Sequence, residues 1–178
     1  MHTPLVTIRR AVPTDAAMLA TFAARTFQET YETENEPAHM TAHLESAYGL
    51  EQQSRELTDP SYITIIAESN AEPAGYAQLR RGTPPSCVAS TNPIELYRFY
   101  VDRPWHGHGV AQSLMLTAHA AAAELDGTLL WLGVWEHNLR ARAFYAKVGF
   151  VDMGTQSFFV GPDRQTDRVL VAPVCLQD

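Results

Sequence analysis

The sequence is organised around one stretch, Val101-Asp102-Arg103-Pro104-Trp105-His106-Gly107-His108-Gly109-Val110-Ala111. An apolar, strand-like run over residues 94–101 leads into it, and a helix-like run over residues 110–125 follows. Glycines let backbone N–H groups approach an anion without interference from a Cβ atom, and a helix N-terminus adds unpaired N–H donors and a favourable dipole. This order predicts a turn that holds a diphosphate, with a plain tight turn as the alternative.

The common nucleotide-binding motifs do not fit this turn. No Lys-Ser or Lys-Thr pair follows its glycines, so the P-loop of nucleoside triphosphatases is excluded by pattern. The Gly-x-Gly-x-x-Gly fingerprint of dinucleotide-binding folds is missing as well. The turn is therefore predicted to be a diphosphate cradle of another kind.

A second informative stretch covers residues 130–150. A buried strand is expected to end at Val134 or Trp135, after which Asn138 is placed to cap a short helix. Gly149 ends that helix. Its aromatic and apolar positions are Ala141, Phe144, Tyr145 and Val148.

Together the two stretches resemble the GNAT superfamily of N-acetyltransferases. The first motif of that family is Gln/Arg-x-x-Gly-x-Gly/Ala, which reads here His106-x-x-Gly109-x-Ala111. The second combines an Asn, an Ala, an aromatic-Tyr pair and Gly-Phe, which read here Asn138, Ala141, Phe144-Tyr145 and Gly149-Phe150. His106 departs from the family pattern, but a histidine can still donate to a phosphate.

A narrower resemblance, to the PaiA-type bacterial acetyltransferases associated with spermine and spermidine, runs nearly end to end. It rests on residues 26–31, 34–35, 44–48, 131–136 and 163–167. The acetyl-CoA motifs are specific, whereas the polyamine assignment depends on whole-chain likeness. The alternatives are an enzyme for a protein N-terminus, a lysine or another small amine, and a non-catalytic acyl-CoA-binding sensor.

The resemblance implies a set of residues that hold acetyl-CoA. The diphosphate would lie on the six residues His106, Gly107, His108, Gly109, Val110 and Ala111. The pantetheine arm would run beside the preceding strand, along Phe99, Tyr100 and Val101, because an amide-bearing chain can pair with a strand edge. Asn138 and Lys147 are further candidate contacts, although Asn138 could serve only as a helix cap.

Acetyl transfer to an amine also requires proton handling. An amine with a pKa of about 10 is mostly protonated near neutral pH and must lose a proton before it attacks. Glu95 is the candidate base, with a solvated carboxylate or a partner of Arg98 as the alternative. The resemblance assigns proton return to the departing thiolate to Tyr145, which could otherwise be a packed aromatic residue.

Acidic residues follow the first predicted helix, in a region that the resemblance places on the acceptor side. The candidate substrate residues are Glu29, Tyr31, Glu32 and Glu34, with Glu36 extending the run. Carboxylates there would attract a polyamine, and a solvated acidic loop is the alternative. Asp163 and Asp167 form a second acidic set that could instead make turn hydrogen bonds.

Composition limits the remaining possibilities. The 178 residues carry a formal charge of −7, which disfavours nucleic acid as a partner and suits a cationic small molecule. No apolar run approaches the length of a membrane span. Two isolated cysteines form no disulfide framework, and the histidines form no metal-like set. We therefore expect a cytoplasmic protein with no metal and no membrane partner, and we also consider a homodimer.

The coarse pattern of elements predicts an α/β fold in a single domain over residues 1–178. Strands are expected over residues 6–9, 63–67, 75–80, 94–101, 130–134, 150–160 and 168–174, with helices between them. The strand-helix-strand-helix middle implies parallel pairing, and hairpins flank it. The prediction is a central mixed, twisted sheet of about seven strands with helices on both faces.

Overall fold

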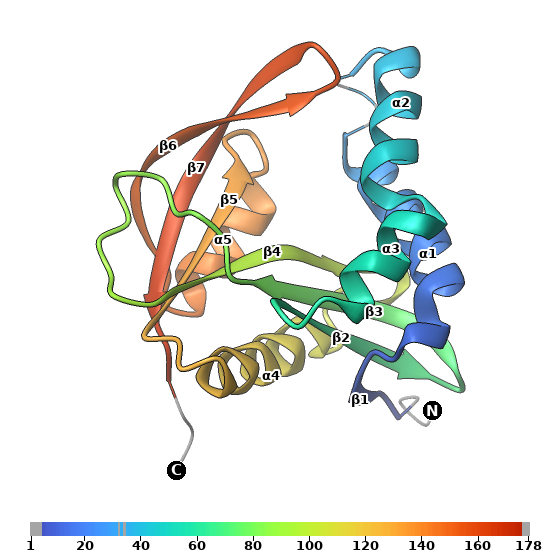
Figure 1. Cartoon of the computed structure of the whole chain (residues 1–178), viewed down its shortest axis with the longest axis horizontal. Helices are drawn as coiled ribbons and strands as arrows, with labels where there is room; N and C mark the ends of the chain where they lie inside the picture. The colour runs from blue at the N-terminus through green and yellow to red at the C-terminus, as the bar shows by residue number, and fades with distance from the viewer. Residues whose placement is uncertain (1–4, 32, 34, 176–178) are drawn as a thin grey trace.

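The computed structural model describes residues 5–31, 33 and 35–175. Its strands are β1 (Thr7–Arg10), β2 (Tyr62–Ser69), β3 (Glu72–Arg80), β4 (Pro93–Val101), β5 (Leu129–Trp135), β6 (Val151–Val160) and β7 (Asp163–Pro173). Its helices are α1 (Ala16–Tyr31), α2 (Pro37–Tyr48), α3 (Leu50–Thr58), α4 (Val110–Glu124) and α5 (Leu139–Lys147), with short 3₁₀ turns η1 (Pro13–Asp15) and η3 (Arg103–Trp105). The strands form one seven-stranded sheet in the order β1-β2-β3-β4-β5-β7-β6 (Figure 1).

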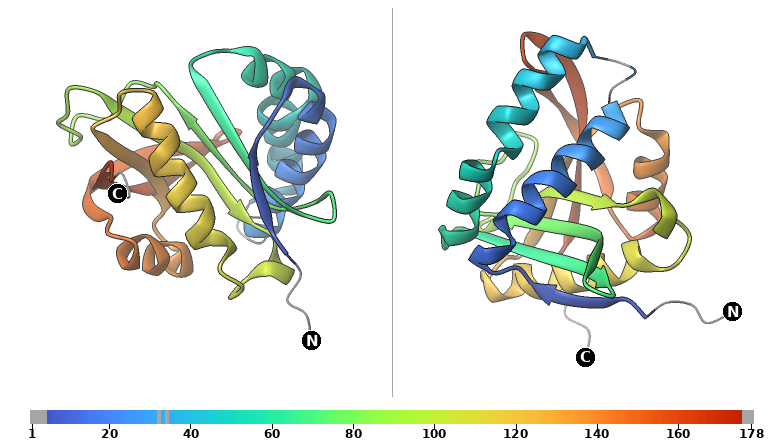
Figure 2. Two further views of the ribbon diagram at one scale, coloured as in Figure 1. Left: turned by 90° about the horizontal axis from the view of Figure 1, so that it is seen from below. Right: turned by 90° about the vertical axis from the view of Figure 1, so that its right-hand side faces the viewer.

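Helices cover both faces of this sheet, with α1 to α3 on one side and α4 and α5 on the other (Figure 2). The alternation of side chains along a strand supplies both cores. On β2, Ile65 packs into the cluster with α4, while its neighbour Ile66 packs with α1. Both side chains are nearly fully buried. The predicted α/β class, the mixed sheet and the two helical layers are confirmed.

The two central strands separate in the middle of the sheet. β4 pairs with β5 in parallel only at Pro93↔Leu129, Ile94↔Leu130 and Glu95↔Trp131. Beyond that point β4 still pairs with β3 as far as Val101, and β5 still pairs with β7 as far as Trp135. The facing backbone edges of residues 96–101 and 132–135 therefore lack each other as partners, and such groups need hydrogen bonds from elsewhere. A ligand with amide groups can supply them.

A bulge in β4 adds to this separation. The register with β3 passes from Gln78↔Arg98 directly to Leu79↔Leu96, so Tyr97 is the extra residue. A bulge bends its strand and increases the local twist. The bulge lies close to the point where the two strands part, since the β4–β5 pairing ends at Glu95.

One predicted boundary was wrong in a way that matters for the site. The last strand was expected to begin at Arg168, but β7 begins at Asp163. The segment 163–167 is polar and lacks the apolar alternation that signals a strand. It is nevertheless paired, residue by residue, with 156–160 of β6, because backbone pairing in a hairpin does not require apolar side chains. Asp167 therefore lies within the sheet and not in a turn.

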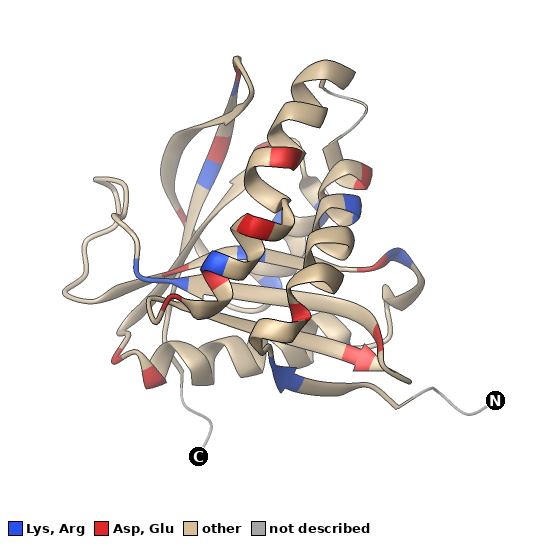
Figure 3. Cartoon of the chain, turned by 45° about the vertical axis from the view of Figure 1, so that its right-hand side comes forward, with Lys and Arg blue, Asp and Glu red and all other residues tan. Residues whose placement is uncertain are grey.

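Charge is interspersed on the side of the molecule seen in Figure 3. Within the described residues shown there, acidic and basic positions alternate over helices and strands, and no basic stripe crosses them. Since a basic stripe is the footprint of a nucleic-acid-binding protein, the expectation of no nucleic-acid partner stays a prediction that this surface supports. Among the described residues, no helix combines the length and the apolar character that crossing a membrane requires.

Candidate active site

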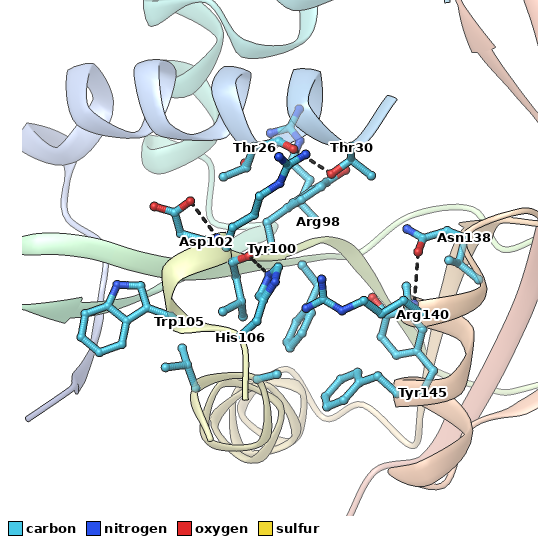
Figure 4. A pocket seen from close by; sticks show the side chains of 18 of the residues that line it. Thr26, Thr30, Arg98, Tyr100, Asp102, Trp105, His106, Asn138, Arg140 and Tyr145 are labelled. Atoms are coloured by element: carbon cyan, nitrogen blue, oxygen red, sulfur yellow. Dashed lines mark hydrogen bonds between the residues drawn. The ribbon is translucent and has the colours of Figure 1, made fainter. Parts of the chain in front are cut away.

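The separation of β4 and β5 opens into a cavity of about 410 Å³, here called the central pocket (Figure 4). Residues of α1, β4, the turn before α4, β5 and α5 line it. Phe99 and Tyr145 belong to the α4–α5 side of the sheet, whereas Tyr31 and Tyr100 belong to the α1 side. The pocket therefore reaches both faces through the gap between the two strands.

The turn before α4 forms one wall of the pocket. Gly107 and Gly109 have φ angles of +81° and +82°, in the left-handed region that favours glycine. A Cβ atom at either position would meet nothing within 4 Å, so the backbone conformation, and not crowding, requires these glycines. The first N–H groups of a helix have no intrahelical partner, and of these the Ser113 N–H already bonds to the Gly109 carbonyl at 3.1 Å. The open N–H groups of residues 110–112 make this wall a suitable anion site.

An ion pair holds the start of this turn against α1. Arg25 donates to both carboxylate oxygens of Asp102 at 2.9 Å, and the same carboxylate accepts from the Arg103 N–H at 3.0 Å. The bidentate geometry fixes orientation as well as distance. Asp102 therefore positions the cradle and, with Arg25 bound to it, is not a free acidic group.

His106 lines the pocket and makes a contact that its place in the motif does not predict. Its Nε2 lies 2.7 Å from the Val101 carbonyl oxygen, and since a carbonyl can only accept, Nε2 donates. In the neutral ring the other nitrogen then carries no proton. His106 can therefore donate to a phosphate only as a cation, and it ties the turn to the end of β4. His108 is exposed, contacts the His106 carbonyl at 3.0 Å and lies outside the pocket lining.

Tyr145 lies where the pocket passes between the strands. Its side chain packs edge-on against Phe99 and Phe150, with ring centroids 6.1 and 5.5 Å apart. No other described residue makes a hydrogen bond to its hydroxyl, and the residue lines the pocket. Burial, with a smaller effect of Tyr31, raises the pKa of Tyr145 above its usual value. The hydroxyl is thus protonated at neutral pH and free to donate into the pocket.

The start of α5 places two polar side chains beside this tyrosine. The Oδ1 atom of Asn138 accepts from the Ala141 N–H at 3.1 Å, which confirms the predicted cap. Arg140, which the sequence analysis missed, is exposed, lines the pocket and has no carboxylate within ion-pair distance among the described residues. Figure 4 shows its side chain directed across the pocket toward His106. Lys147, at the far end of α5, is exposed and outside the lining.

The structure does not bring Glu95 into the central pocket. It lies on the part of β4 that still pairs with β5, and its Oε2 is 2.6 Å from Nε of Arg80. The expected alternative partner, Arg98, is bound elsewhere. Burial raises the pKa of Glu95, and Arg80 opposes that effect. Glu95 is therefore a buried carboxylate that Arg80 pairs with, and neither residue lines the pocket.

Of the four predicted acceptor residues, Glu29 and Tyr31 line the pocket, and Glu32 and Glu34 lie outside the described residues. The Glu29 carboxylate is 3.1 Å from Arg25 and 3.8 Å from Arg103, which offset part of its charge. Tyr31 stands edge-on to Trp135 with ring centroids 5.9 Å apart. Its hydroxyl shares a hydrogen bond with that of Tyr100, and burial raises the pKa of both groups.

Beneath the acceptor side lies a buried network that the sequence analysis did not anticipate. Arg98 donates to Glu56 at 2.6 Å and to Gln78 at 2.8 Å. Its other terminal nitrogen donates to the Ala47 carbonyl at 2.9 Å. The guanidinium also lies over the ring of Tyr48 at 4.6 Å. These contacts satisfy Arg98, so although it lines the pocket it acts as a support for the wall.

Comparisons with known proteins agree with this geometry. The acetyltransferase (GNAT) family matches residues 21–150. An uncharacterized N-acetyltransferase of Mycobacterium tuberculosis is 35% identical over 158 residues, which cover 89% of this chain and 97% of the relative. Another, from Lactobacillus delbrueckii subsp. lactis, is 31% identical over 145 residues and covers 82% and 84%. The chain belongs to the GNAT acetyltransferase family. It is an acetyl-CoA-dependent N-acetyltransferase.

Solved structures share the fold of this GNAT chain. PaiA N-acetyltransferase of Thermoplasma acidophilum, in complex with coenzyme A, has a TM-score of 0.76 at 17% identity and covers 95% of this chain and 99% of its own. A GNAT protein of Rhodopseudomonas palustris has a TM-score of 0.71 at 18% identity and covers 97% of each chain. Within the described residues, no three His, Cys, Asp or Glu side chains gather as metal ligands, and the expectation of no metal stays a prediction.

Proposed function

We propose that this acetyltransferase acts on a primary amine, with polyamines such as spermidine and spermine as favoured acceptors, and that the amine attacks acetyl-CoA directly in a ternary complex. The observation that carries the proposal is the continuity of the central pocket. It runs from open backbone N–H groups on one wall, past the hydroxyl of Tyr145, to a polar wall on α1 that carries Glu29. Two substrates can therefore meet at the gap in the sheet.

The acetyl-CoA side of the proposal uses the residues that line the pocket. The backbone of residues 107–111 would hold the diphosphate, supported by the helix N-terminus. The open edge of β4 at residues 99–101 would pair with the amide groups of the pantetheine arm. Asn138, whose side-chain NH₂ is not used by the cap, would contact the cofactor from α5. So would Arg140, which has no carboxylate partner among the described residues. His108 and Lys147 lie outside the lining and are left out of this set.

The chemistry requires one proton donor at the thioester sulfur. Tyr145 would hydrogen-bond the departing thiolate and supply its proton, as its position between the strands and its protonated hydroxyl allow. Proximity of the two substrates in one pocket would supply much of the remaining acceleration. The thioester itself supplies the activated acetyl group.

Polyamines are favoured by charge and by whole-chain resemblance to PaiA-type acetyltransferases. Glu29 borders the pocket, the chain carries a formal charge of −7, and cationic ligands are drawn toward such surfaces. A lysine side chain or a protein N-terminus presents the same ammonium group with fewer additional charges. Polyamines therefore differ from these other acceptors in the number of positive charges that they carry.

Release of free thiol from acetyl-CoA, measured across a panel of amines, tests this proposal. The panel contains spermidine, spermine, a lysine peptide, an aminoglycoside and a monoamine of similar length. We expect the highest kcat/KM with the polyamines. Equal kcat/KM for the monoamine and spermidine would refute the polyamine preference, and a better peptide would reassign the enzyme to proteins. Coenzyme A binding without thiol release for any amine would point to a sensor.

A further inference from the structure

Asp167 is a buried carboxylate to which the mechanism above gives no role. It lies on β7, directly opposite Trp135 of β5 and Gln156 of β6. Residues directly opposite each other in an antiparallel pair share a face, and Trp135 contacts Tyr31 of α1. Asp167 is therefore on the acceptor side of the sheet, with only 7% of its surface exposed.

Its lack of a cation distinguishes Asp167 from the other buried acids. Glu56 is paired with Arg98 at 2.6 Å, and Glu95 with Arg80 at the same distance. No Arg, Lys or His lies within ion-pair distance of Asp167 in the part of the chain that the structure describes. Its strand neighbour Arg168 bonds to Asp152 instead, at 2.6 Å. Since an unpaired buried charge is costly, a partner brought by a ligand is the natural complement.

Asp167 is not itself part of the lining of the central pocket, but Gly133 brings its carboxylate next to the pocket. The glycine lines the pocket, and an added Cβ atom would lie 2.8 Å from Oδ2 of Asp167 and would also collide with the Gln156 amide. Any other residue at position 133 would push both groups away. The carboxylate therefore lies against Gly133, the pocket residue of β5 that has no side chain. Its charge contributes to the raised pKa of Tyr31, so the two side chains are close.

The surroundings of Asp167 suit a group that exchanges a proton. Tyr31 faces it from α1, Gln156 donates a hydrogen bond to it from β6, and its β5 neighbours Gly133 and Trp135 carry no ionisable group. On the same face of β7, Gln165 has a buried Oε1 with no partner among the described residues. Burial raises the pKa of Asp167 to about 6, against the smaller effect of Gln156. A base with a pKa near the working pH is effective in catalysis.

We propose that Asp167 receives the ammonium group of the acceptor and takes one of its protons, a role that rests on the amine acetylation proposed above. The ammonium transfers one proton to the carboxylate, directly or through one water, and later the carboxylate releases it to solvent. The neutral nitrogen forms a bond to the acetyl carbon, and the C–S bond breaks. The second proton that nitrogen loses ends on the thiolate, through Tyr145. The products are the acetylated amine, coenzyme A with a free thiol, and one proton.

The pH dependence of kcat/KM for spermidine, with acetyl-CoA saturating, tests this role in the variant Asp167→Asn. The variant keeps an acceptor oxygen for Gln156 but cannot take a proton. We expect kcat/KM near neutral pH to fall by about 10²- to 10⁴-fold, the range for general acid–base groups. The acidic limb near pH 6 should disappear, and the rate should instead rise toward the pKa of the amine. Coenzyme A affinity, measured by calorimetry, should not change.

Two further variants make the test specific. Asp163→Asn, on the same strand but bonded to His39 at 2.8 Å and outside the part of β7 that pairs with β5, should keep the wild-type profile. Gly133→Ala keeps the carboxylate and displaces it, so it should lower kcat/KM for the amine while coenzyme A still binds. An unmoved acidic limb in Asp167→Asn, or a Gly133→Ala enzyme with wild-type kcat/KM, would overturn the role of Asp167. Wild-type enzyme that releases no thiol with any amine would instead overturn the proposed function, and this role with it.

Discussion

The cradle wall of the central pocket comes from one continuous stretch, residues 101–111, whereas the acceptor wall is assembled from α1, β4 and β5, with β7 paired to β5 beside it. The cradle uses backbone N–H groups and glycine conformations, for which sequence and function are closely linked. The acceptor wall uses side chains that are distant in sequence and meet only through strand register and helix packing. The comparison teaches that the shared cofactor can be recognised from a local motif, while the acceptor has to be found in the fold.

Tyr145 stands between the two walls, and among the changes described below its replacement should have the largest effect on activity. Tyr145→Phe keeps the ring packed against Phe99 and Phe150 but removes the hydroxyl. We expect kcat to fall by about 10- to 10⁴-fold, since general acid–base groups reach the upper part of that range. Steady-state kinetics measure kcat, and calorimetry should find coenzyme A affinity unchanged. A wild-type kcat in this variant would show that the Tyr145 hydroxyl takes no part in the reaction and that the ring serves only for packing.

The pH dependence of the free energy of unfolding should reveal the cost of burying the Asp167 carboxylate beside the acceptor wall. In the native state the pKa of Asp167 is raised from 3.8 to about 6, so the folded protein binds this proton more tightly than the unfolded chain. The stabilisation is complete below pH 4 and is lost as the pH rises through 6. Asp167→Asn should therefore raise the free energy of unfolding at pH 8 by about 3 kcal/mol, from two pKa units at ~1.4 kcal/mol each.

Urea denaturation of the wild type and Asp167→Asn at pH 4 and pH 8 measures this difference. The gain should be present at pH 8 and absent at pH 4. A variant that gains stability while it loses activity is typical of a residue held for function. Equal free energies of unfolding at pH 8 would mean that a partner compensates the buried charge of Asp167. The carboxylate would then not destabilise the folded protein.

On the cradle wall, Gly109→Val should weaken coenzyme A binding. Valine disfavours the left-handed conformation at φ +82°, and its side chain would occupy the open space where a phosphate meets the N–H groups. Loss of a hydrogen bond to a charged group costs about 1.5–3 kcal/mol, or roughly tenfold to more than a hundredfold in affinity. Calorimetric titration with coenzyme A checks this. Unchanged affinity in a folded variant would remove the diphosphate from this turn.

The smallest effect is expected at the rim of the acceptor wall. Glu29→Gln should raise KM for spermidine more than KM for a monoamine, by an amount typical of exposed charges, about 0.2–1 kcal/mol. The difference should shrink as salt rises, because screening acts over about 8 Å at physiological ionic strength. An equal change for both amines, or a wild-type KM for spermidine that ignores salt, would show that Glu29 serves only its arginine partners.

The fold and the glycine turn before α4 could be predicted from the sequence because their signals are local. Glycines before a helix, the capping Asn138 and the aromatic residues of α5 each report on their own neighbourhood, and the structure agrees with these positions. The acceptor side could not be read in the same way. Glu95 was favoured as a base because it begins the strand that leads to the cradle, but Arg80 binds it away from the pocket. Asp167 was hidden in a polar segment that did not signal a strand.

The strand register of β7 explains why the acceptor residues could not be predicted from the sequence. The opposition of Asp167 to Trp135 and the approach of its carboxylate to Gly133 depend on where β7 begins, which differs from the predicted start by five residues. Arg140 was missed for another reason, since a single basic residue on a helix surface is common. Its signal was its position, two residues after the capping Asn138.

A crystal structure of the enzyme with coenzyme A and an acetylated polyamine tests the central claim most directly, because it places both substrates in one pocket. We predict that the diphosphate contacts the N–H groups of residues 107–111 and that the sulfur lies within hydrogen-bond distance of the Tyr145 hydroxyl. The acetylated nitrogen should lie on the α1 side, facing Gly133 and Asp167. Coenzyme A bound outside the gap between β4 and β5, or a polyamine on the opposite face of the sheet, would contradict the account.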